Sequence, residues 1–150
     1  MKTYIITLSQ FFPKTHPRSG QRTFFFDNLF VRKKHTIRAN YEFWKDRFEF
    51  LDNCDAQLSV RFWTGKPYSS PQHQFVSLGH TDCIGLQRLR IYKKDGFSAQ
   101  IVEDDGRERF VDIRQLAHND GLSVSDWCDW FAKYDLSQDF ALIHFTKFRY

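Results

Sequence analysis

The sequence contains few cysteines and no long apolar segment. Its three cysteines, Cys54, Cys83 and Cys128, are widely spaced and odd in number, a pattern typical of a reducing compartment rather than of a disulfide framework. No apolar run approaches the roughly 20 residues that a transmembrane helix requires, and the first residues lead into a strand pattern rather than a signal peptide. We therefore expect a cytoplasmic protein with no membrane partner.

Several motifs of catalysis are also missing. The chain has no glycine-rich phosphate loop, serine nucleophile elbow or zinc-deaminase signature. His80, Cys83 and the nearby His73 are of the kinds that bind zinc, but no second pair completes a tetrahedral set at the usual spacing. We expect neither a metal ion nor an organic cofactor.

The composition is that of one globular domain with a basic region. Its 150 residues are 41% hydrophobic and 27% charged, and the formal net charge is +4, which suits a single folded domain with a core of its own. The positive charge is concentrated between residues 14 and 38, where Asp27 is the only acidic residue. This distribution favours a polyanionic partner such as RNA or a nucleotide.

Hydrophobic periodicity predicts an α+β fold. Helical spacing or capping residues indicate helices, and alternation or turn residues indicate strands. We expect strands at residues 4–8, 56–63, 84–92, 97–101, 110–113 and 140–148, and helices at residues 24–32, 40–51, 113–118 and 123–134. Residues 4–8 are expected to be buried on both faces, residues 64–79 to form a long loop, and Gln87-Arg88 to form a bulge. Because hairpins outnumber strand–helix–strand units, the pattern favours a mixed or antiparallel barrel with flanking helices.

Residues 31–38 combine cationic and hydrogen-bonding side chains where a predicted helix gives way to a strand. In an extended strand, Lys34, Thr36 and Arg38 share one face, and Lys33 lies on the other with His35. The face that carries Lys34, Thr36 and Arg38 can contact a ligand. Alternatively, the segment is simply a basic edge strand, whose charges discourage pairing with a strand of another molecule.

A second group of residues suits single-stranded RNA. Arg61 and Trp63 share the outer face of the strand at residues 56–63, where Trp63 can stack on a base while Arg61, Lys34 and Arg38 contact phosphates. A surface cation–π contact between Arg61 and Trp63 explains the same pair. Arg18 lies in the polar loop before the basic stretch and is a further candidate for nucleic-acid binding.

The pattern Lys33-x-x-Thr36-x-Arg38, followed by Ala117-His118-Asn119-Asp120 before a capped helix, resembles the ASCH domain. This family belongs to the PUA-like β-barrel superfamily, and residues 142–145 are similar to its closing strand. The resemblance implies one PUA-like domain over residues 1–150, with a cleft beside the barrel that binds RNA or modified bases.

Bacterial acetylcytidine amidohydrolases share this fold, and the resemblance implies a catalytic Lys33, Thr36 and Asp120, with Asp120 in place of a glutamate. It selects Lys33 rather than Lys34, which requires the chain to be still turning at Lys33. Three functions therefore stay open: binding of RNA or a nucleotide, removal of an acyl group from a modified base, and protein interaction without chemistry. The sequence predicts no oligomeric state.

Overall fold

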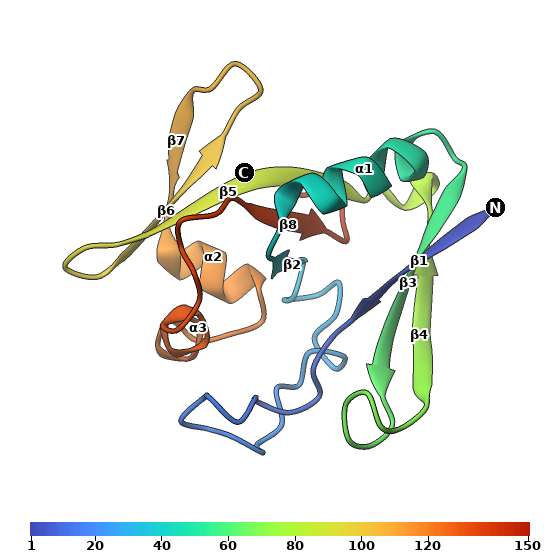
Figure 1. Cartoon of the computed structure of the whole chain (residues 1–150), viewed down its shortest axis with the longest axis horizontal. Helices are drawn as coiled ribbons and strands as arrows, with labels where there is room; N and C mark the ends of the chain where they lie inside the picture. Colours follow the sequence, from blue (N-terminus) through green and yellow to red (C-terminus); the bar gives the residue numbers. More distant parts are fainter.

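The computed structural model describes residues 1–150. It contains three α-helices and two β-sheets, so the α+β class is confirmed (Figure 1). The helices are α1 (Tyr41–Asp52), α2 (Ile113–Asn119) and α3 (Val124–Phe131), and a short 3-10 helix covers His80–Asp82. None of the helices is long and apolar enough to span a membrane.

The smaller sheet has the order β1-β3-β4, with β1 (Lys2–Thr7), β3 (Ala56–Trp63) and β4 (Gln72–Leu78). The larger sheet has the order β2-β8-β5-β6-β7, with β2 (His35–Arg38), β8 (Phe140–His144), β5 (Gly85–Lys93), β6 (Phe97–Val102) and β7 (Glu108–Val111). Strands β1 and β3 are parallel, and every other neighbouring pair is antiparallel. The chain thus forms a mixed sheet and an antiparallel sheet.

The core is built around β8. This strand pairs with β2 on one side and β5 on the other, and all five of its residues are buried. A strand buried on both faces reads as a continuous apolar run, and Phe140, Ala141, Leu142 and Ile143 fit this rule. Because β2 pairs with this buried strand, the basic stretch that includes β2 lies directly against the centre of the molecule.

Local signals in the sequence correctly predicted several elements. The Asn40 side chain accepts a hydrogen bond from the Phe43 amide at the start of α1, and the Ser123 hydroxyl accepts one from the Asp126 amide at the start of α3. Asp95 and Gly96 have φ angles of 56° and 117°, as a two-residue hairpin turn requires. These predictions rest on short-range hydrogen bonds and backbone preferences.

Residues 24–32 do not form the predicted helix. They form turns, with left-handed φ angles of 61° at Phe24 and 69° at Phe30. The carbonyl of Asn28 accepts hydrogen bonds from the amides of Val31, Arg32 and Lys33, which replaces the one-to-one ladder of a helix.

Three expectations about the strands were also wrong. Residues 64–79 include β4, so the connecting loop is shorter than expected. The bulge lies between Val60 and Arg61 in β3, whereas β5 pairs with β6 and β8 without a register shift. Strand β1 is buried on one face only, since Ile6 is 2% exposed whereas Ile5, on the opposite face, is 45% exposed.

Candidate functional site

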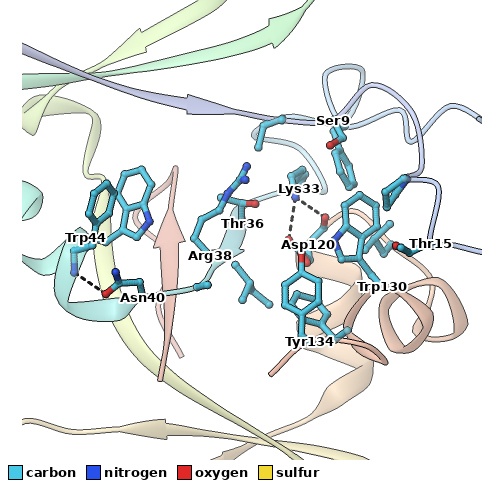
Figure 2. A pocket seen from close by; sticks show the side chains of 18 residues that line it. Ser9, Thr15, Lys33, Thr36, Arg38, Asn40, Trp44, Asp120, Trp130 and Tyr134 are labelled. Carbon is cyan, nitrogen blue, oxygen red and sulfur yellow. Dashed lines mark hydrogen bonds and ion pairs between the residues drawn. The ribbon is translucent and has the colours of Figure 1, made fainter. Parts of the chain in front are cut away.

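A cavity of about 570 Å³ lies beside β2 and brings together Lys33, Thr36, Arg38 and Asp120 (Figure 2). Asp120 comes from the loop between α2 and α3, far along the chain from the other three residues. Six aromatic side chains form much of the wall: Phe25, Phe43, Trp44, Trp130, Phe131 and Tyr134. In the view of Figure 2, Trp44 and Trp130 lie on opposite flanks of the polar groups.

Lys33 and Asp120 form a buried ion pair at this cavity. The Lys33 ammonium group, 1% exposed, lies 2.9 Å from Asp120 Oδ1, 2.7 Å from the Asp120 carbonyl oxygen and 4.0 Å from the centre of the Phe25 ring. Burial lowers the pKa of Lys33, Asp120 opposes this shift, and Arg38 adds to it. Burial by itself would raise the pKa of Asp120, but Lys33 and His35 outweigh it, so the pKa is lowered. The site therefore holds an ionised carboxylate against an amine that loses its proton more readily than a surface lysine.

Gly121 allows the Asp120 loop to lie against Lys33. It has a φ of +83°, and a Cβ at this position would lie 3.2 Å from Lys33 Cβ and 3.3 Å from Phe25 Cδ1. Only glycine combines this left-handed conformation with so close an approach. The Asn119-Asp120-Gly121 turn thus fixes the position of the Asp120 carboxylate at the cavity wall.

Thr36 and Arg38 follow Lys33 along the same wall. The Thr36 hydroxyl makes no hydrogen bond within the protein, although only 6% of the residue is exposed. The Arg38 guanidinium donates to the backbone carbonyl of Thr7 through Nη2, while its buried Nε has no partner. Both side chains therefore offer unused hydrogen-bonding capacity to a ligand.

Lys33, rather than Lys34, faces the cavity. Strand β2 begins at His35, and Lys33 belongs to the turn before it. The resemblance to the ASCH motif required such a turn at Lys33. The Lys34 ammonium group lies 5.3 Å from the centre of the Phe148 ring, and Lys34 does not line the cavity. The prediction that Lys34 belongs to the same ligand-contacting face as Thr36 and Arg38 was therefore wrong, because the chain turns before it becomes extended.

His35 lies behind the ion pair, and no pattern in the sequence predicted that it would support this pair. His35 Nε2 lies 2.7 Å from the Tyr150 hydroxyl. This hydroxyl also accepts a hydrogen bond of 3.1 Å from the side-chain amide of Asn119. The hydroxyl hydrogen then has His35 Nε2 as its acceptor, so a neutral His35 carries its own hydrogen on Nδ1. Nδ1 lies 3.7 Å from Asp120 Oδ1, and burial lowers the pKa of His35. The arrangement places an N–H group, without a positive charge, toward the carboxylate.

The other predicted nucleic-acid contacts do not join this site. Arg61 donates to the side chains of Ser59 and Gln72, and the Trp63 ring lies 5.2 Å from that of Tyr68. Arg18 lines a neighbouring hollow of about 240 Å³, where it lies 2.6 Å from Asp126. Of the residues predicted to contact nucleic acid, Arg38 alone lines the large cavity.

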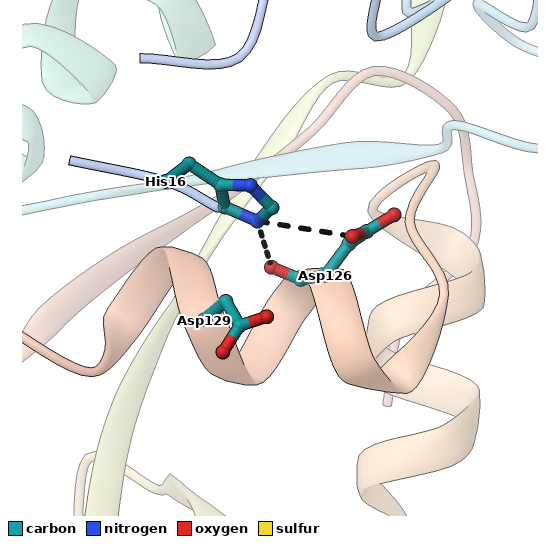
Figure 3. A group of neighbouring side chains, drawn as sticks. All are labelled: His16, Asp126 and Asp129. Atoms are coloured by element: carbon teal, nitrogen blue, oxygen red, sulfur yellow. Dashed lines mark hydrogen bonds and ion pairs between the residues drawn. The ribbon is translucent and has the colours of Figure 1, made fainter. Parts of the chain in front are cut away.

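His16, Asp126 and Asp129 have ligand atoms close enough to suggest a metal site, all within 4.8 Å of one another (Figure 3). His16 Nδ1 accepts a hydrogen bond from the Arg18 amide at 3.0 Å, so Nε2 carries the hydrogen and donates to the Asp126 carbonyl at 3.0 Å. Both ring nitrogens are therefore used. His16 therefore links the polar loop that contains Arg18 to α3 through a hydrogen bond, and neither of its ring nitrogens has a lone pair left to bind a metal.

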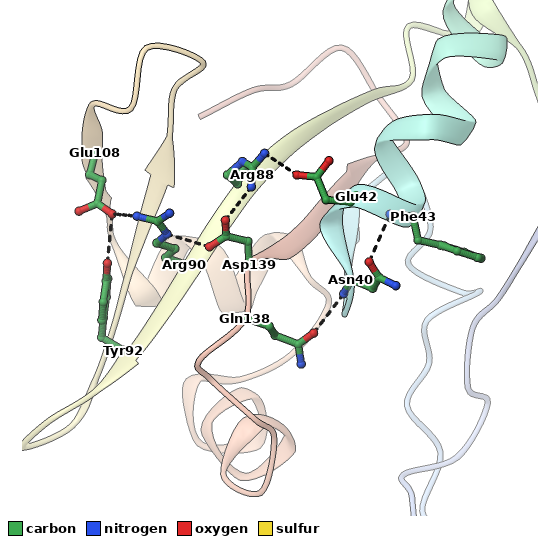
Figure 4. Close-up of polar contacts among 9 residues, drawn as sticks. All are labelled: Asn40, Glu42, Phe43, Arg88, Arg90, Tyr92, Glu108, Gln138 and Asp139. Carbon is green, nitrogen blue, oxygen red and sulfur yellow. Dashed lines mark hydrogen bonds and ion pairs between the residues drawn. The ribbon is translucent and has the colours of Figure 1, made fainter.

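A network of ion pairs fixes the start of α1, next to the cavity (Figure 4). Asp139, just before β8, accepts hydrogen bonds of 2.7 Å from Arg88 and from Arg90, and Arg88 also contacts Glu42 of α1 at 2.9 Å. The side chain of Gln138 accepts a hydrogen bond from the Asn40 amide. These contacts hold the end of β2 and the beginning of α1 against the central strand.

No family model matches the chain, and neither does a curated protein or a solved structure. The resemblance to the ASCH domain therefore stays a prediction.

Proposed function

We propose that the protein is an ASCH-like, PUA-like domain whose cavity binds a single nucleobase, as a nucleoside, a nucleotide or an unpaired base of RNA. The observation that carries the proposal is the convergence of Lys33, Thr36, Arg38 and Asp120 on one aromatic-walled cavity. A volume of about 570 Å³ suits one small ligand. Aromatic walls favour a flat ring, and the polar groups supply the few directional contacts that fix its orientation.

The same geometry favours a single base over a long strand of RNA. A nucleic-acid groove needs a row of cations and stacking rings along the backbone, but Arg61 and Trp63 are engaged outside the cavity. The ligand of this cavity is therefore defined by one ring and its substituents.

Calorimetric titration with cytidine and acetylcytidine tests the proposal. We expect saturable binding that weakens about tenfold in Trp130→Leu, since stacking on an aromatic ring contributes roughly 1–3 kcal/mol per base. Trp63→Leu, which changes a tryptophan outside the cavity, is the matched control and keeps the wild-type affinity. Absence of binding to either compound, or an equal loss in both variants, would contradict the proposal.

Hydrolysis of an acylated base is a second candidate, favoured by the free Thr36 hydroxyl beside the Lys33–Asp120 pair. In this reaction, water oxygen bonds to the acyl carbon, the carbon–nitrogen bond breaks, and the exocyclic amine leaves with a proton. Thr36 donates to the acyl oxygen as negative charge develops on it. The lowered pKa of Lys33 suits a proton donor to the departing amine, and the ionised Asp120 carboxylate is the group beside it that can accept a proton from water.

Thr36→Val separates this chemistry from folding. The substitution removes a hydroxyl that has no partner in the protein, so we expect an unchanged melting temperature. Release of acetate from acetylcytidine should fall by 10²-fold or more, the usual effect of losing one donor to a developing oxyanion, and Thr36→Ser should retain most of the rate. If the wild-type protein releases no acetate, the hydrolase candidate is wrong while the binding proposal stands.

A further inference from the structure

The charges at the cavity do not balance. Lys33 and Asp120 neutralise each other at a distance of 2.9 Å. Arg38 has no carboxylate within 4.0 Å, the limit of an ion pair, although it lines the same cavity. The cavity therefore carries one positive charge that the protein leaves without a counter-charge.

Arg38 is also short of hydrogen-bond acceptors. Its Nη2 donates to the Thr7 carbonyl, but its Nε is buried without a partner. A cation held in this way destabilises the free protein unless something compensates its charge. Arginine remains charged in proteins because its pKa lies so high, so loss of a proton does not remove this charge, and the guanidinium N–H groups at the cavity are available to an acceptor outside the chain.

We propose that Arg38 binds an oxyanion carried by the ligand of the cavity, a phosphate or a carboxylate group. A planar guanidinium with free N–H groups matches two oxygens of either anion. Figure 2 shows the Arg38 guanidinium between Trp44 and the Lys33–Asp120 pair in this view, so an anion there lies next to the aromatic wall that would hold a ring. The inference rests on the proposed function only for the ring, and it makes the ligand an anionic compound such as a nucleotide or a carboxylated base.

The first test uses inorganic phosphate and does not depend on a nucleobase. In ¹H–¹⁵N spectra at constant ionic strength, phosphate should shift the Arg38 Nε–H signal saturably while chloride does not. Arg38→Gln should abolish the corresponding phosphate-dependent shifts of the Trp44 and Trp130 indole signals, and Arg38→Lys should reduce them. Arg114→Gln, a change at an exposed arginine outside the cavity, is the control and should behave as the wild type. Lack of a saturable wild-type shift overturns the proposal whether or not the variants fold.

The second test identifies the source of the anion. Cytidine 5′-monophosphate, orotate and cytidine compare a phosphate, a ring carboxylate and no anion on related rings. We expect at least one of the two anions to bind tenfold or more tightly than cytidine, and this preference to disappear in Arg38→Gln. Whichever anion shows the preference is the better model of the ligand.

The two proposals fail in different ways. Equal affinity for all three compounds overturns the role of Arg38 and leaves the proposed nucleobase binding intact. Phosphate binding at Arg38 without binding of any nucleoside or nucleotide supports the anion site and contradicts the nucleobase proposal.

Discussion

At the scale of single residues, the site depends on the absence of a side chain at Gly121. The turn that carries Asp120 reaches Lys33 because no side chain projects from Gly121, where a Cβ would lie only 3.2 Å from Lys33 Cβ. The sequence predicted Lys33, Thr36 and Asp120 as a group through their resemblance to a known motif. It did not predict His35 and Tyr150 behind them, because their contact joins residues 115 positions apart and no local pattern reports it.

Gly121→Ala should destabilise the protein more than Gly106→Ala. Both glycines have left-handed φ angles, of +83° and +86°, but a Cβ at Gly106 has nothing within 4 Å. The left-handed backbone alone costs about 1–2 kcal/mol for a residue with a side chain, and the contact with Lys33 and Phe25 adds to this cost at Gly121 only. Chemical denaturation measures the difference, and equal losses in the two variants would contradict the close approach.

At the scale of elements, the best predictions from sequence concerned helices with caps and strands with alternation. Strand β4 was missed because it is mostly exposed and shows no clear apolar face. Residues 24–32 were wrongly predicted as a helix because their apolar spacing is helical, whereas the hydrogen bonds to the Asn28 carbonyl close a tighter turn. Hydrophobic periodicity shows which residues are apolar, but it does not show which carbonyl oxygen accepts the hydrogen bond of each backbone amide.

The pairing of β2 with β8 makes stability depend on pH. It places His35 opposite His144, with ring centres 5.6 Å apart. Burial, with a smaller contribution from the nearby charge of Arg149, lowers the pKa of His144 to about 2, and burial lowers that of His35 as well. Both histidines therefore bind protons more readily in the unfolded chain, where the pKa is about 6.5.

The free energy of unfolding should decrease as the pH falls below about 6.5, because the unfolded state then binds more protons at these two histidines than the folded state does. For His144 the decrease is about 2 kcal/mol at pH 5, and His35 adds to it in the same direction. Urea denaturation at pH 5 and pH 7 measures this difference. His144→Gln should reduce it and His80→Gln, at an exposed position, should not; a stability independent of pH over this range would contradict the neutral buried pair.

At the scale of the whole molecule, β2, α1, α3 and the loop after β1 enclose one cavity with aromatic walls and a polar side. Trp44 of α1 and Trp130 of α3 line the cavity, whereas Trp127 of α3 is fully buried and does not. Helical spacing identifies the inward face of each helix, but it does not distinguish packed interior from cavity wall. The aromatic wall of the cavity therefore emerged only from the arrangement of distant elements.

The four tryptophans provide the most direct test of the central claim, that this cavity binds a nucleobase ligand. Trp44 and Trp130 line the cavity, whereas Trp63 and Trp127 do not, and each indole N–H gives its own signal in a ¹H–¹⁵N spectrum. During titration with cytidine 5′-monophosphate, we expect the signals of Trp44 and Trp130 to shift saturably and those of Trp63 and Trp127 to stay in place. Unchanged Trp44 and Trp130 signals, or a shift confined to Trp63, would contradict the account.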